Sequence, residues 1–411
     1  MDDSPAHTAM EAVARHSYGR LIAFLAAHSG DVAGAEDALS EAFLAALKKW
    51  PLEGVPQKPE AWLLHAARNR LLDKMRHLRV RENAEPHLQQ LVEAQVVAER
   101  RDAFPDERLK LLFVCAHPAI DSAVRTPLML QTVLGIDAAR IASAFLVSPA
   151  ALSQRLVRAK NKIREAGIPF HVPDPREWPD RISFVLDAIY AAYTSGWESL
   201  SDPSTAHHPL AQEAIDLGRT LVQLMPTEPE AHGLLALMIH CEARRDARFN
   251  SHGEFVPLDE QDAALWLRPM IDEAETHLRT AASYKKLGRF QLEAAIQSIH
   301  AMRLTTGHID WNEIALLYEG LTQISSGIGS LAGRAVALAQ AGNPDRALAE
   351  LEKLPEDRIT NYQPYWAARG HILHLLQRNR EAVQAFTRAA SLTDDPALRA
   401  HLFKKITQIN H

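Results

Sequence analysis

One stretch in the first half of the chain has clear helix boundaries. Thr126-Pro127 pairs an N-capping residue with a proline at the first helical position, and Gly135 is placed to end that helix. Asp137 can cap a second, short helix that continues through Phe145. Ser148-Pro149 repeats the cap-and-proline signal before a longer helix that ends at Gly167. A short helix, a turn and a second helix in this order predict a helix-turn-helix spanning residues 137–163.

The second of these two helices has distinct faces when its residues are placed 100° apart. One face is apolar and is expected to pack on the preceding helices; it consists of Leu152, Leu156, Ala159 and Ile163. Gln154, Arg158 and Asn161 project from the opposite side, and Arg155, Lys160, Lys162 and Arg164 flank the apolar face. In the major groove Arg pairs with guanine, and Gln or Asn pairs with adenine. This pattern favours a DNA-reading helix over an ordinary basic surface helix.

The rest of the sequence favours an all-α protein. Ala and Leu recur throughout, whereas alternating Val, Ile and Thr residues are scarce. The hydrophobic share of 47% and the charged share of 23% are ordinary for a globular protein. The acidic start Met1-Asp2-Asp3 does not resemble a signal peptide, and no stretch of about twenty apolar residues predicts a membrane span. Two cysteines exclude a disulfide framework. A cytoplasmic protein without membrane attachment is expected.

Positive charge is clustered in the first part of a chain whose net charge is −6. Residues 1–168 are slightly basic overall, whereas the remainder is acidic. One basic run consists of Arg68, Arg70, Lys74, Arg76, Arg79 and Arg81, and another of Arg155, Arg158, Lys160, Lys162 and Arg164. Each run is a candidate phosphate-binding strip, with a solvated helix face as the alternative.

Composition divides the chain into helical blocks. The first covers residues 8–80, with a predicted loop at 51–59 that holds three prolines and a glycine. A polar connector at 81–104 leads to the block at 105–167, and a helical extension follows at 168–411. Within that extension, small and aromatic residues have the spacing of a tetratricopeptide unit; they are Trp366, Gly370, Ala382, Phe386 and Ala389. Ala347 lies one unit before Ala382, so tetratricopeptide-like repeats are predicted near 331–396.

The first two blocks resemble regions 2 and 4 of bacterial sigma factors of the extracytoplasmic-function type, within the sigma-70 family. The acidic motif of region 2 corresponds to the stretch Ala35-Glu-Asp-Ala-Leu-Ser-Glu-Ala-Phe43. Its later part corresponds to Trp62-Leu63, Ala67-Arg-Asn-Arg70 and Leu72-Asp-Lys-Met-Arg76. The core of the region 4 recognition helix corresponds to Arg155-Leu-Val-Arg-Ala-Lys160. The long helical extension resembles that of one subgroup of these factors, although Tyr193-Thr-Ser-Gly-Trp197 departs from the subgroup's usual segment.

The resemblance implies a sigma factor that binds core RNA polymerase and directs promoter-specific transcription initiation. Polymerase contacts would come from Glu36, Asp37 and Glu41. Contacts with the −10 element would come from Trp62, Arg68, Asn69, Arg70, Lys74 and Arg76. Contacts with the −35 element would come from Ser153, Gln154, Arg155, Arg158, Lys160 and Lys162. The C-terminal extension would regulate activity or bind a protein or peptide partner.

The alternatives are an enzyme, a helix-turn-helix regulator, and a scaffold whose basic runs are only solvated faces and which would show no salt-dependent DNA binding. An enzyme is disfavoured, because we find no phosphate-binding glycine loop, nucleophile motif or set of histidines with zinc-site spacing, and no catalytic residue, metal or cofactor is expected. A helix-turn-helix regulator with a tetratricopeptide sensor that recruits holoenzyme would explain the second and third blocks. It would leave the first block unexplained.

Overall fold

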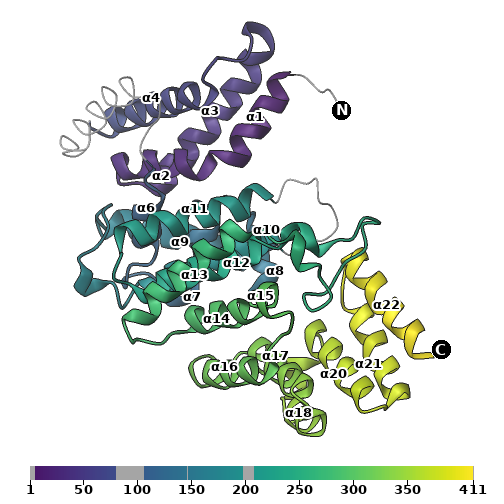
Figure 1. Cartoon of the computed structure of the whole chain (residues 1–411). Coiled ribbons are helices and arrows are strands. Elements are labelled where there is room, and N and C mark those ends of the chain that lie inside the picture. Colours follow the sequence, from purple (N-terminus) through teal and green to yellow (C-terminus); the bar gives the residue numbers. More distant parts are fainter. Residues whose placement is uncertain (1–4, 80–105, 146, 198–207, 411) are drawn as a thin grey trace. The chain divides into compact units, whose positions relative to one another are not determined.

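A computed structural model describes residues 5–79, 106–145, 147–197 and 208–410, which form two compact units, Met1–Ala192 and Tyr193–His411 (Figure 1). The described residues consist of helices, 3-10 turns and loops, with one isolated bridge between Phe249 and Phe255. The predicted all-α class is therefore confirmed. The division between units lies within α10 (Ile182–Trp197). The predicted connector at 81–104 lies outside the described residues.

The first unit begins with four helices that pack on one another. They are α1 (Pro5–His16), α2 (Tyr18–Ser29), α3 (Val32–Glu53) and α4 (Pro59–Arg79). Leu21, Ile22 and Leu25 of α2 are fully buried, as are Leu39 of α3 and Leu63 of α4. Apolar side chains of this size each contribute about 2 kcal/mol when they are removed from water, so this shared core holds the bundle together.

The loop predicted at residues 51–59 is shorter in the structure. Helix α3 continues through Pro51 to Glu53, and the amide of Gly54 still donates to the carbonyl of Trp50 at 3.0 Å. Trp50 is buried and meets the Trp62 ring edge-on, with centroids 5.6 Å apart. This packing favours one more helical turn, although Pro51 lacks the amide hydrogen that would donate to the preceding turn.

Four further helices follow in the first unit. They are α6 (Arg108–Cys115), α7 (Ser122–Thr132), α8 (Ala138–Ala144) and α9 (Pro149–Glu165). A 3-10 turn at Pro175–Glu177 leads to α10.

The prediction that Thr126 caps α7 is wrong. The helix begins one turn earlier, where the Asp121 side chain accepts a hydrogen bond from the Ala123 amide at 3.0 Å. Pro127 is therefore an interior helical residue, and it is buried beside Val124 and Leu128. An aspartate cap with an apolar residue in the first turn defines the start better than the Thr-Pro pair does.

The second unit consists of consecutive helices that pack on their neighbours in chain order. Its first part contains α11 (His208–Leu224), α12 (Pro229–Glu242), η2 (Arg245–Arg248), η3 (Ala263–Leu265), α13 (Arg268–Ser283), α14 (Arg289–Ala301) and α15 (Arg303–Thr306). Its second part contains α16 (Trp311–Ile324), α17 (Ile328–Gln340), α18 (Pro344–Leu351), α19 (Glu356–Ile359), α20 (Gln363–Leu375), α21 (Asn379–Ser391) and α22 (Pro396–Asn410) (Figure 1).

Helix α12 is the central element of the first part. It contacts α11, α13 and α14, and nearly all of its residues are buried. The Glu230 carboxylate accepts hydrogen bonds from the Phe290 amide at 3.0 Å and the Gln291 amide at 3.2 Å, both in the first turn of α14, where amides lack partners within the helix. A side chain at Gly233 would lie 2.7 Å from the Gln291 backbone, so glycine permits this close approach of α12 and α14.

The second part contains two successive helix pairs, α17 with α18 and α20 with α21. Ala347 and Ala382 occupy corresponding positions in the two pairs, and both are fully buried. In the second pair the Gly370 backbone lies against the Phe386 ring, because a Cβ atom at Gly370 would be 2.8 Å from that ring. The spacing of small and aromatic residues thus corresponds to a direct contact between the two helices.

None of the helices in the described ranges is both long enough and apolar enough to cross a membrane.

Candidate nucleic-acid and polymerase interface

Helices α8 and α9 form the helix-turn-helix that the sequence predicts. The Asp137 side chain accepts from the Ala139 amide at 2.8 Å at the start of α8. The Ser148 hydroxyl accepts from the Ala151 amide at 3.3 Å at the start of α9. Gly135 and Gly167 both have φ near +60°, a conformation that side-chain-bearing residues rarely adopt, and they lie after the ends of α7 and α9. Leu146, in the turn, lies outside the described residues.

The two faces of α9 largely match the predicted wheel. The apolar face is buried and consists of Leu152, Leu156, Ala159 and Ile163. Five predicted −35 residues are exposed; they are Ser153, Gln154, Arg155, Arg158 and Lys162. Their exposed face also contains Val157, whose exposed fraction is 58%. Sequence reasoning missed Val157, although an exposed apolar side chain on a DNA-reading helix can contact a thymine methyl group.

Lys160 does not lie on that exposed face in this conformation, and its assignment as a −35 contact stays a prediction. Its side chain is 8% exposed, and its Nζ lies 2.6 Å and 2.7 Å from the two carboxylate oxygens of Glu36 in α3. The Gln131 side-chain oxygen of α7 accepts a third hydrogen bond at 2.8 Å. Because Lys160 follows the buried residue Ala159, a small rotation of α9 is enough to turn its stem inward.

Glu36, a predicted polymerase contact, is therefore engaged within the first unit. Its side chain is 20% exposed, and burial raises its pKa, an effect that the charge of Lys160 opposes. The contact is extended by Arg164, whose guanidinium lies 3.4 Å from Asp31, the N-cap of α3. Helices α3 and α9 thus pack together through charges that sequence reasoning had assigned to different partners.

The other acidic residues predicted to contact polymerase pair with basic residues of α4. Lys74 lies 3.2 Å from Asp37, and Arg70 lies 3.2 Å from Glu41, with all four side chains more than half exposed. Exposed pairs of this kind contribute about 0–1 kcal/mol, so they can separate at little cost when a partner binds. Asn69, also exposed, has its amide nitrogen 3.3 Å from His65 Nδ1.

The remaining predicted −10 residues differ in their surroundings. Trp62 is half-buried, with its ring against Trp50. Arg68 is buried, because it shares a helix face with the buried Leu64 and Leu71, and its assignment to the −10 element stays a prediction. The Arg76 side chain lies outside the described residues, although its backbone belongs to α4.

Exposed apolar side chains accompany the acidic residues of α3. Leu44 is 57% exposed and Leu47 is 44% exposed, and Leu52 near the end of the helix is 87% exposed. Leu44 follows Glu41 by three residues, so the two lie on the same side of α3. Sequence reasoning missed this surface, whose signal was a set of leucines on the polar side of an amphipathic helix.

Comparisons with known proteins find family matches for two parts of the chain. Residues 13–81 match sigma-70 region 2, and residues 181–282 match a family of unknown function, DUF6596. The chain is 39% identical over 374 residues to the uncharacterized protein R00370 of Rhizobium meliloti (strain 1021), covering 90% of this chain and 88% of that protein. No solved structure matches. The region 2 match and the four-helix bundle that carries it identify the chain as a sigma-70 family factor, in one family with the Rhizobium protein.

Proposed function

We propose that this protein is a sigma factor of the extracytoplasmic-function type that directs core RNA polymerase to specific promoters. The observation that carries this proposal is a capped helix-turn-helix, α8–α9, that follows a sigma-70 region 2 in one compact unit. A regulator that recruits intact holoenzyme would need the helix-turn-helix alone. The bundle α1–α4 would then have no role.

In this mechanism region 2 supplies the polymerase and −10 contacts. Glu41 and Asp37, together with the exposed Leu44 and Leu47, offer an acidic and apolar surface for the polymerase. Arg70 and Lys74 would release these acids and turn to the DNA backbone, since phosphate contacts dominate affinity while a few base contacts specify sequence. No step involves a covalent bond to the protein.

Region 4 would read the −35 element through the exposed face of α9. Arg155, Arg158 and Gln154 have the side chains that pair with purine edges in the major groove, and Val157 adds an apolar contact. Lys160 would join them only after it leaves Glu36. The same separation would free Glu36 for the polymerase, so we infer that the contact between α3 and α9 competes with both partners.

The C-terminal unit is proposed to regulate this competition. It includes a region that matches a family of unknown function, and its helix pairs α17–α18 and α20–α21 are proposed to be tetratricopeptide-like units. Comparing the full chain with residues 1–197, which end with α10, tests the regulatory role in transcription assays, with circular dichroism as a check on folding. Equal output per folded molecule would refute it.

The decisive test is transcription in vitro with purified core polymerase and no other sigma factor. We expect start sites to map to a shared promoter sequence. Arg158→Ala should reduce transcription from these promoters at least tenfold, whereas Arg176→Ala, an exposed arginine outside the helix-turn-helix, should leave it unchanged. Initiation only when a second sigma factor is supplied would support the recruited-regulator alternative instead.

A further inference from the structure

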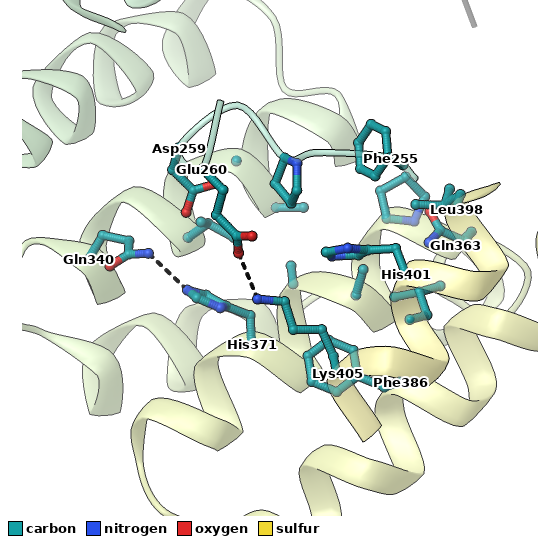
Figure 2. A pocket seen from close by; sticks show the side chains of 18 of the residues that line it. Phe255, Asp259, Glu260, Gln340, Gln363, His371, Phe386, Leu398, His401 and Lys405 are labelled. Atoms are coloured by element: carbon teal, nitrogen blue, oxygen red, sulfur yellow. Dashed lines mark hydrogen bonds and ion pairs between the residues drawn. The ribbon is translucent and has the colours of Figure 1, made fainter. Parts of the chain in front are cut away.

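The second unit contains a cavity of about 470 Å³. One wall is the segment 255–260, and the other walls come from α17, α20 and α22, with Trp311 of α16 and Phe386 of α21 completing the lining (Figure 2). The volume falls within the range of about 300–1,000 Å³ that is typical of small-molecule sites. The segment 255–260 belongs to the region that matches DUF6596, whereas the lining helices follow that region in the chain. The cavity therefore lies between the DUF6596 region and the helices that follow it.

Charged contacts hold the segment 255–260 across the helices. Lys405 of α22 lies 2.8 Å from Glu260, and the neighbouring Lys404 lies 3.2 Å from Glu254. The Arg303 guanidinium donates at 2.6 Å to the backbone carbonyl of Asp259. An extended peptide lying along α17, α20 and α22 would meet this segment, whereas a compact molecule fits beneath it. The segment therefore favours a small ligand over a peptide.

The walls of the cavity are mostly apolar. Aromatic rings come from Phe255, Trp311 and Phe386, and aliphatic side chains come from Val336 and Leu402, among others. Aromatic walls bind flat apolar groups with favourable stacking or edge contacts. The rings arise from three separate segments, so a ligand with an apolar body would contact all of them.

Two histidines supply polar groups at the wall. Gln340 Nε2 lies 3.1 Å from His371 Nε2, so the amide donates to that nitrogen and His371 Nδ1 carries the proton. The His401 ring meets the Phe255 ring edge-on, with centroids 5.6 Å apart, and points into the cavity (Figure 2). Within the described part of the chain, neither His401 nitrogen nor His371 Nδ1 has a hydrogen-bond partner. Burial lowers the pKa of both rings, which keeps them uncharged near neutral pH.

The charges around the cavity argue against an anionic ligand. Lys405 is paired with Glu260, and the carboxylate of Asp259 is a second acid at the same wall (Figure 2). Lys404, at the adjoining surface, is paired with Glu254. With neutral histidines, positive charge is therefore not in excess at this site. The described residues also contain no group of three or more His, Cys, Asp or Glu side chains that could hold a metal ion.

We propose that this cavity binds an uncharged small organic molecule with a flat apolar body and a hydrogen-bonding group that faces His371 and His401. Such a ligand contacts the segment 255–260 and three helices at once. Its binding energy is therefore available to fix the segment against α22. The C-terminal unit would then respond to a small molecule without contacting DNA or polymerase.

The test uses the full-length protein and two uncharged probes, Nile red by fluorescence and quinoline by saturation-transfer NMR. Val336→Trp fills the cavity and should weaken Nile red binding at least tenfold. His401→Phe keeps a ring but removes the hydrogen bonds, which should weaken quinoline binding about three- to tenfold. Val383→Trp, at a half-buried valine of α21 outside the cavity, is the matched control and should bind both probes as the native protein does.

Circular dichroism verifies that each variant folds. If Val336→Trp does not fold, Ala367→Leu at the cavity wall replaces it, with the same expected loss. Equal binding by the native protein and the filled variant would overturn the proposal, because the probes would then lie elsewhere. Failure of both probes to bind the native protein would also overturn it. The same holds if a selected peptide, and neither probe, protects residues 255–260 from hydrogen exchange.

Discussion

The ion pair between Lys160 and Glu36 should control how tightly α9 packs on α3. Lys160→Met keeps an unbranched side chain at this position but removes the cation that donates to the Glu36 carboxylate and to the Gln131 side-chain oxygen. Breaking a buried pair by removing one partner costs about 3–5 kcal/mol. Because the Glu36 side chain is 20% exposed and solvent screens the pair, we expect a smaller cost of about 2 kcal/mol for the packing of α9 on α3.

Hydrogen exchange measures this local free energy directly. A loss of about 2 kcal/mol accelerates exchange of the α9 amides about 30-fold if they exchange through local opening. The matched control is Lys162→Met, an exposed lysine on the same helix, which should change exchange less than about threefold. The double variant Glu36→Gln/Lys160→Met should lose less than the sum of the two single variants, with a coupling of about 1–2 kcal/mol.

Two results would refute this reasoning. If Lys160→Met accelerates exchange no more than Lys162→Met, the buried ion pair does not hold the helices together. If the losses of the single variants add without coupling, Lys160 and Glu36 act independently, and the proposed competition with promoter and polymerase loses its physical basis.

Three further predictions concern other parts of the chain. Burial lowers the pKa of His300 to about 3, so as pH falls below about 6.5 the unfolded state binds a proton that the folded state does not bind. Between pH 6.5 and 5 the protein should therefore lose roughly 2 kcal/mol of stability. His300→Leu should flatten that part of a Tm-versus-pH curve. Gly370→Ala places a methyl group 2.8 Å from the Phe386 ring and should cost about 1–3 kcal/mol in thermal unfolding, whereas Gly327→Ala, with its nearest neighbour at 3.9 Å, should cost less. Arg158→Ala should weaken holoenzyme binding to a cognate promoter by about 1–3 kcal/mol in fluorescence anisotropy, and an equal loss on random DNA would show that Arg158 does not read the sequence.

Local signals in the sequence predicted local structure well. Asp137 and Ser148 each cap a helix through an amide only two or three residues away, so the sequence contains both partners of the interaction. The Thr126-Pro127 signal failed because Asp121, one turn earlier, offered a competing cap. The proline-rich loop was shortened because the burial of Trp50 is a tertiary contact that propensity cannot show.

Two predicted site residues, Lys160 and Arg68, are buried, and one common reason explains why the sequence does not predict their burial. Lys160 and Arg68 lie at the border between the apolar and polar faces of their helices, where a helical wheel does not decide which way a long side chain turns. Lys160 is buried because its partner Glu36 lies 124 residues earlier in the chain, a separation across which helical periodicity carries no information. The exposure of residues in the middle of the polar face, such as Arg158, follows from helical periodicity alone.

Under the proposed function, the contact between Lys160 and Glu36 would keep the protein from binding its promoter and the polymerase. A lysine at the border of a recognition helix has a long apolar stem that can pack while its charged end turns either toward DNA or, as Lys160 does here, toward a neighbouring helix. The desolvation cost of the buried pair offsets much of its Coulombic attraction, so the conformation in which α9 packs on α3 is stabilised only modestly. A reversible contact between α9 and α3 requires such a modest stabilisation, because the binding free energies of polymerase and DNA together must exceed it. The exposed pairs Arg70–Glu41 and Lys74–Asp37 set no comparable barrier, so under the proposed regulation by the C-terminal unit the contact between Lys160 and Glu36 is the step that a signal would change most.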